Sequence, residues 1–204
     1  THVRLDYNIA SGIMRTVLEN RISTVVIGWD GTTSFKESVL GSIIGQLLRG
    51  TEKRVLVSMI RHPLCNTQGI TLILPHGIDH NPGLYSVVDA VKRISEGTSV
   101  SVKALVVGDN PAIYKEIFNR LSPDIPIIFK GLDGWKSLMD MLRTRPYSPT
   151  ELMIVSSTRR DSPGWHPILQ VLPKRIISLF KCNLIIVYSQ IEERRDNLKH
   201  FDDK

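Results

Sequence analysis

Short apolar runs alternate with amphipathic stretches along most of this chain of 204 residues. Strands are expected near residues 24–27, 54–60, 70–74, 100–107, 125–129, 152–156 and 184–188. Helices are expected at residues 8–20, 40–49, 83–95, 111–121, 135–143 and 165–180. Because the strands are nearly uniformly apolar, both faces of their sheet should be covered. The pattern predicts an α/β fold, a parallel sheet with right-handed crossovers and helices on both faces.

Three local signals refine these boundaries. Gly50 follows the second helical stretch and suits a helix C-cap. The run 109–111, Asp-Asn-Pro, indicates a helix N-cap rather than a catalytic acid. Pro173 lies inside the last helical stretch and should kink or split it, because proline lacks the N–H that a helix interior needs.

The composition excludes some functions. The net charge is +6, but the basic residues are scattered in short pairs and no long basic stretch is interleaved with aromatics, so nucleic acid is not an expected partner. No apolar run has the length of a membrane span, and no signal peptide begins the chain. Cys65 and Cys182 form no CxxC pair, which favours a reduced cytosolic setting. The start at Thr1, on residues that resemble the end of a strand, indicates a piece cut from a longer protein.

An internal repeat divides the chain. Residues 25–28 and 153–156 both end a strand before a long polar loop, a helix and a last apolar strand, at an offset of about 130 residues. Turn-forming residues at 62–69 separate the two copies. We therefore expect residues 1–65 to be the C-terminal half of a first unit, 66–190 a complete second unit and 191–204 a charged tail. The alternative is that any α/β protein shows similar strand–loop–helix–strand strings.

The loop after residues 24–27 carries a glycine motif. Gly28, Gly31, Gly41 and Ser42 stand in the pattern G-x2-G-x9-G-S ahead of a helix and a strand. Glycines let the backbone turn tightly and approach a ligand closely. Free N–H groups at a helix N-terminus suit an anion, and the Ser42 hydroxyl would add one more donor. The motif predicts a phosphate cradle, unless the glycines only shape a crossover loop.

This spacing in this context resembles the universal stress protein family, which binds ATP or AMP through the same motif. The resemblance implies a cofactor-binding role for these four residues and no metal. The family's adenine-contacting Asp and Val would precede Thr1, and Asp30 places a carboxylate in the loop. The second unit lacks the motif: its loop reads SSTRRDSPGW from Ser156, and its first strand ends in Pro75-His76-Gly77. We expect that second unit to be structural.

Residues 7–13 and 25–29 also resemble, in overall texture, the tandem stress-protein-like region that follows the membrane domain of bacterial cation–proton antiporters of the sodium/hydrogen exchanger type. That resemblance implies a cytosolic regulatory domain at the cytoplasmic face of the bacterial inner membrane. Its partner would be an upstream transmembrane transporter domain of the same chain. The alternative is a free-standing cytosolic tandem stress protein that binds nucleotide.

Other constellations are weaker. His76, Asp79 and His80 have the spacing of metal ligands on a helix, but the glycine and proline around them place them in a loop. Polar residues at the edge of a loop are therefore a simpler interpretation than a metal site. No GxSxG elbow and no convincing Cys–His pair is present, so we expect no enzyme.

Two expectations concern association. In the stress-protein family the last strands of two units pair across a dimer axis, so residues 55–59 and 184–188 should pair here. A first unit without its early strands would leave a sheet edge uncovered, so we expect a homodimer through that unit or through the final strands.

Overall fold

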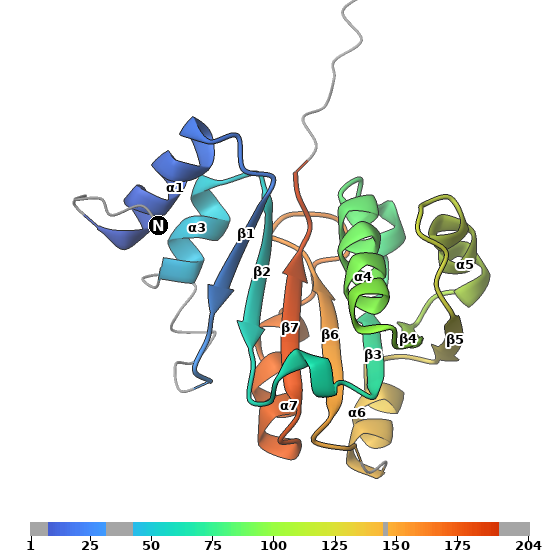
Figure 1. The fold of residues 1–204 in the computed structure, drawn as a ribbon. Coiled ribbons are helices and arrows are strands. Elements are labelled where there is room, and N and C mark those ends of the chain that lie inside the picture. The colour runs from blue at the N-terminus through green and yellow to red at the C-terminus, as the bar shows by residue number, and fades with distance from the viewer. Residues whose placement is uncertain (1–7, 32–42, 145–146, 192–204) are drawn as a thin grey trace, which may run out of the picture.

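The computed structural model describes residues 8–31, 43–144 and 147–191, which form one seven-stranded sheet between two layers of helices (Figure 1). The strands are β1 (Thr24–Gly28), β2 (Arg54–Met59), β3 (Gly69–Leu74), β4 (Val102–Val107), β5 (Ile127–Leu132), β6 (Glu151–Ser157) and β7 (Asn183–Tyr188). Their order across the sheet is β1-β2-β7-β6-β3-β4-β5, and all neighbours are parallel except β2 and β7. The predicted α/β class is confirmed.

The helices follow the predicted pattern with shifted ends. They are α1 (Ile9–Glu19), α3 (Ile43–Gly50), α4 (Leu84–Thr98), α5 (Pro111–Asn119), α6 (Trp135–Thr144) and α7 (Leu172–Leu179), with 3₁₀ turns η1 (Leu64–Asn66), η2 (Ile78–His80) and η3 (Pro167–Gln170). Within the described ranges, no helix is long and apolar enough to cross a bilayer.

Prolines and caps explain several of these ends. The last helical stretch is split as Pro173 predicts: η3 ends at Gln170, and Pro173 sits in the first turn of α7, where a missing N–H costs little. The 109–111 signal is confirmed at Asn110, whose side chain caps α5 by accepting from the Ala112 N–H. Gly50 is the last residue of α3 and not the residue that follows it, so the predicted C-cap at Gly50 was wrong. Strand β5 lies two to three residues later than predicted, because its ladder with β4 continues to Leu132.

The seam between β2 and β7 organises the sheet. The two strands pair antiparallel with Val57 opposite Ile186, which confirms the predicted pairing of the two final strands. Val57 also pairs with Ile27 of β1, and Ile186 pairs with Val155 of β6. The β1–β2 and β6–β7 ladders therefore run in opposite directions about a local two-fold axis at the seam (Figure 1). The division into units 1–65 and 66–190 fits this arrangement and stays a prediction.

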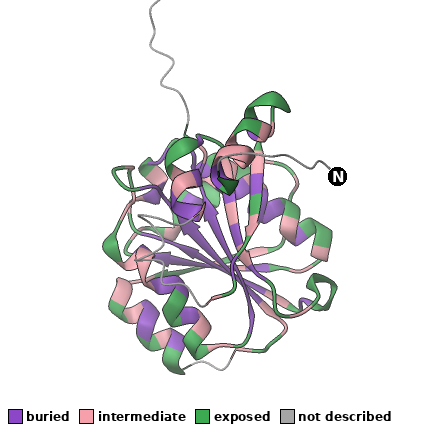
Figure 2. Ribbon diagram, turned by 90° about the vertical axis from the view of Figure 1, so that its left-hand side faces the viewer, coloured by how far each residue is buried: buried purple, intermediate pink, exposed green. Residues whose placement is uncertain are grey.

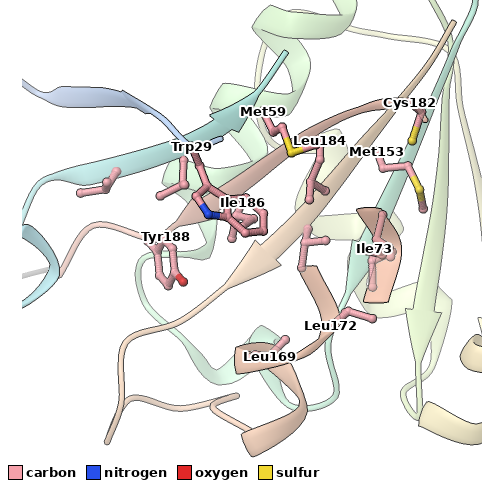
Figure 3. Close-up of a cluster of buried hydrophobic side chains, with 14 of the residues drawn as sticks. Trp29, Met59, Ile73, Met153, Leu169, Leu172, Cys182, Leu184, Ile186 and Tyr188 are labelled. Carbon is pink, nitrogen blue, oxygen red and sulfur yellow. The ribbon is translucent and has the colours of Figure 1, made fainter. Parts of the chain in front are cut away.

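Alternate residues of the central strands fill two separate cores. On one face, α6 and α7 pack over the middle of the sheet and α1 and α3 over β1 and β2, around Trp29, Met59, Leu184, Ile186 and Tyr188 (Figure 3). On the other face, α4 and α5 cover β3, β4 and β6. Figure 2 shows the buried strands running between exposed helix surfaces. Burying large apolar side chains on both faces is the main source of stability here.

On the second face of the sheet, no described residue of β1 belongs to the buried core. Val26 of that strand is 66% exposed, whereas Val25 on the opposite face is buried against α1. β1 is also an edge strand, like β5 at the other end of the order. Among the described residues, β1 and β5 are thus the two less covered edges of the sheet.

Candidate functional site

The predicted glycine loop begins at the carboxyl end of β1. Gly28 is the last residue of that strand, and a Cβ added to it would meet no atom within 4 Å. Gly31 has φ +79°, and a Cβ there would lie 3.0 Å from Ile177 Cδ1 of α7 and 3.0 Å from Met59 Sδ. Gly41 and Ser42 lie outside the described residues. Whether the four residues meet around a ligand stays a prediction.

Gly28 and Gly31 differ in whether the fold itself requires a glycine at that position. Gly31 is needed by the fold itself, because its backbone is left-handed and it packs closely against α7. Among the described residues, nothing requires a glycine at Gly28, because no described atom lies within 4 Å of a Cβ built there. Open space beside a strand end is what close approach of a ligand needs, so Gly28 is the more informative residue for a binding test.

The second half of the chain has its own strand-end crevice, which lies at the carboxyl ends of β3 and β6. Open parallel sheets bind ligands at such a point, where the strand order reverses direction. The Asp109 carboxylate, which follows β4, accepts hydrogen bonds from the Gly77 N–H (2.8 Å) and the Tyr114 hydroxyl (2.7 Å). His76 Nδ1 lies 2.5 Å from the other oxygen of Asp109. The two oxygens of Asp109 therefore hold the β3–η2 loop in place. Burial beside Asp109 raises the pKa of Tyr114.

The loop after β6 folds onto the same crevice. Gly164 has φ +76°, and a Cβ there would lie 2.8 Å from Ile78 Cα and 3.0 Å from Ile78 N. Asn81 Nδ2 donates to the Pro163 carbonyl oxygen at 3.1 Å. The loops that follow β3 and β6 are thus in backbone contact, which occupies the point where a parallel α/β sheet would hold a ligand.

Arg159 in that loop joins the two halves of the chain. It is 8% exposed, and its guanidinium donates to the carbonyl oxygens of Leu48 (3.0 Å), Thr51 (2.9 Å), Lys53 (2.8 Å) and Ser189. The first of these belongs to the last turn of α3, so a cation caps the negative end of that helix in place of the absent glycine cap. Burial lowers the pKa of Arg159, opposed by the charges of Tyr188 and Glu52.

A pocket of about 360 Å³ opens beside Arg159, between α3 and the carboxyl ends of β6 and β7. We call it the junction pocket, because α3 comes from the first half and its other walls come from the second. Its polar wall is formed by Arg49, Thr158, Arg159, Arg160, Asp161 and Trp165. This loop was predicted to be structural because it lacks the glycine motif, and the Thr-Arg-Arg run after β6 is the sequence feature that could have indicated the pocket.

The remaining side chains that could bind a metal or act as nucleophiles lie apart from one another. Across the described residues, no three His, Cys, Asp or Glu side chains gather closely enough to hold a metal ion. His80 Nδ1 and Asp79 are 3.7 Å apart, and His76 turns to Asp109 instead. Both cysteines are free; Cys65 is exposed, and burial raises the pKa of the Cys182 thiol to about 11. A thiol with such a pKa is a poor nucleophile near neutral pH.

Comparison with known proteins gives a result for the fold only. No family model matches the sequence, and no curated protein matches it. A crystal structure of a universal stress protein from Archaeoglobus fulgidus DSM 4304 is similar, with a TM-score of 0.54 over 90% of this chain and 13% sequence identity. The fold is that of a universal stress protein. The chain spans 66% of that protein's length, so the likeness does not cover the whole of it.

The universal stress protein fold gives the two candidate regions their positions. The glycine loop follows β1, and the Thr-Arg-Arg loop follows β6, which is the strand related to β1 by the two-fold arrangement at the seam. In the second region the glycines of the motif are absent and the strand-end crevice is occupied by protein contacts. Of the two, the first retains open space at the strand end, beside Gly28.

Proposed function

We propose that this chain is a non-catalytic regulatory domain that binds an adenine nucleotide, ATP or AMP, through the loop that begins at Gly28. The observation that carries the proposal is the universal stress protein fold, with a G-x2-G spacing at the end of β1 and open space at its first glycine. A non-catalytic role is supported by the candidate reactive groups. The Asp109 carboxylate accepts hydrogen bonds from Gly77 and Tyr114 and lies against His76, and the Cys182 thiol is buried.

The wider setting that we propose is the cytoplasmic face of the bacterial inner membrane, where the domain would follow the membrane part of a cation–proton antiporter. The resemblance of residues 7–13 and 25–29 to such regions supports it. The alternative is a free-standing tandem stress protein. The full open reading frame separates the two. A run of hydrophobic spans upstream of Thr1 supports the antiporter, whereas a start codon a short distance upstream of Thr1, with no such spans between, supports the free protein.

Replacing Gly28 with valine should remove nucleotide binding while the fold is retained. The structure leaves room for the side chain at this strand end, so the loss would come from blocking the ligand's approach. On the expectation that residues 1–65 are only the C-terminal half of a unit, the 204-residue chain should bind AMP or ATP only at about millimolar affinity, about −4 kcal/mol. Calorimetry on a longer protein that includes the early strands of that unit should show tighter binding.

Two comparisons decide the outcome. Gly134→Val is the matched control, because a Cβ at Gly134 also meets nothing within 4 Å and the residue lies before α6, away from the loop. Gly41→Val, at the last glycine of the motif, should abolish binding as well. No nucleotide binding by the longer protein, or equal binding with and without Gly28→Val, would contradict the proposal.

We also propose that the chain forms a homodimer through the uncovered edge at β1. The final strands β2 and β7, the other expected route, are paired with each other inside the chain and leave no free edge. Val26 is 66% exposed on an edge strand, and such surfaces promote association. Val26→Glu should shift the chain toward monomer in sedimentation, whereas Ile128→Glu on the opposite edge strand, where Ile128 is 72% exposed, should not. A wild-type chain that sediments as a monomer at micromolar or higher concentration would rule this dimer out.

A further inference from the structure

The junction pocket has the size and position of a small-molecule site. Its volume of about 360 Å³ lies within the usual range for such sites, roughly 300–1,000 Å³. One wall is Gly45, Leu48 and Arg49 of α3, and the opposite wall is the loop after β6. Since these walls are more than 100 residues apart in sequence, a bound molecule would touch both halves of the chain.

The charge on the polar wall is positive. Arg49, Arg159 and Arg160 line the pocket, and Asp161 is the one carboxylate among its described lining residues. The four groups that accept from Arg159 are backbone carbonyls, which satisfy its hydrogen bonds without cancelling its charge. Glu52 is the carboxylate whose charge acts on Arg159, and with Asp161 it leaves the three arginines of the wall in excess. Such a partly buried excess of positive charge favours an anion nearby, because electrostatic attraction is strong where water is excluded.

Two further groups point to an organic anion rather than a bare ion. Thr158 is 3% exposed, and its hydroxyl has no hydrogen-bond partner among the described residues, although it lines the pocket. A buried hydroxyl without a partner costs free energy, which a ligand acceptor would recover. Trp165 lines the same pocket, with the Arg160 guanidinium 5.8 Å from the centre of its ring. An indole next to a guanidinium is a surface on which a planar ring can stack.

We propose that the junction pocket binds a small organic anion that carries a planar ring, with its charged group at Arg160, Arg159 and the Thr158 hydroxyl and its ring against Trp165. Binding there does not depend on the glycine loop. Because the ligand would contact α3 together with the β6 and β7 ends, it should hold the two halves together and raise the melting temperature of the chain.

The test uses phenyl phosphate as the probe, in calorimetry and thermal unfolding of the full chain. Phenyl phosphate should bind saturably and raise the melting temperature, inorganic phosphate should bind at least about tenfold more weakly, and benzyl alcohol should not bind. Arg160→Gln should weaken phenyl phosphate binding about tenfold or more, because it removes the charge of an exposed side chain that lies over the Trp165 ring. Arg175→Gln, an exposed arginine of α7 that does not line the pocket, is the matched control.

Thr158→Val separates ligand binding from folding. Valine has the shape of threonine without the unpaired hydroxyl, so the free protein should keep or gain stability while phenyl phosphate binds more weakly. Gly28→Val should leave this binding unchanged, which distinguishes the pocket from the glycine loop. The proposal is overturned by the absence of saturable phenyl phosphate binding, by equal binding of inorganic phosphate, or by binding that neither Arg160→Gln nor Thr158→Val weakens.

Discussion

Replacing Arg159 with alanine should lower the free energy of unfolding by about 2–4 kcal/mol, a large fraction of the 5–15 kcal/mol that keeps a domain folded. The substitution leaves the carbonyl oxygens of Leu48, Thr51, Lys53 and Ser189 without the donors that the guanidinium supplies. It also removes the cation at the end of α3. Urea unfolding, followed by circular dichroism, measures the change.

The geometry of the guanidinium should matter as much as its charge. Lysine offers one compact ammonium group, which cannot reach four carbonyls that lie around a planar fork. Arg159→Lys should therefore lose most of the stability that Arg159→Ala loses, whereas the control Arg175→Ala at an exposed position should change little. If lysine restored wild-type stability, the charge alone would be responsible and the hydrogen bonds to the four carbonyls would contribute little.

The fold was predictable because its signals are local. Apolar runs of strand length between amphipathic stretches indicate a parallel sheet wherever they occur. The seam between β2 and β7 was predicted from the resemblance to the stress-protein family, and Val57 opposite Ile186 confirms it. Strand β5 was misplaced because Lys130 and Gly131 interrupt the apolar run, although the ladder with β4 carries the strand through them.

The site was less predictable because its contacts are long-range. Arg159 lies in a loop whose sequence is polar throughout, and only the fold shows that it reaches carbonyls more than 100 residues away. Gly31 was predicted as a ligand-contacting glycine, yet its neighbours Ile177 and Met59 give it a packing role that spacing cannot reveal. Burial of the Thr158 hydroxyl without a partner is likewise visible only once α3 and β6 are placed side by side.

Gly164→Ala should be the second strongly destabilising change, at about 2–5 kcal/mol. A residue other than glycine costs roughly 1–2 kcal/mol in the left-handed region, and overpacking against fixed atoms typically costs a further 1–3 kcal/mol. Both apply here, because Gly164 has φ +76° and its new methyl group would lie 2.8 Å from Ile78 Cα. Backbone cannot rotate away as a side chain can, so the loop after β6 or the turn η2 must move.

Gly97→Ala is the control, because Gly97 lies near the end of α4 with φ in the ordinary range and open space at its Cβ. Alanine is the better helix former, so this variant should keep its stability or gain up to about 1 kcal/mol. Thermal unfolding of both variants beside the wild type gives the comparison. If Gly164→Ala unfolded at the wild-type temperature, the loop after β6 would not be held against η2, and the crevice at the ends of β3 and β6 would be open to a ligand after all.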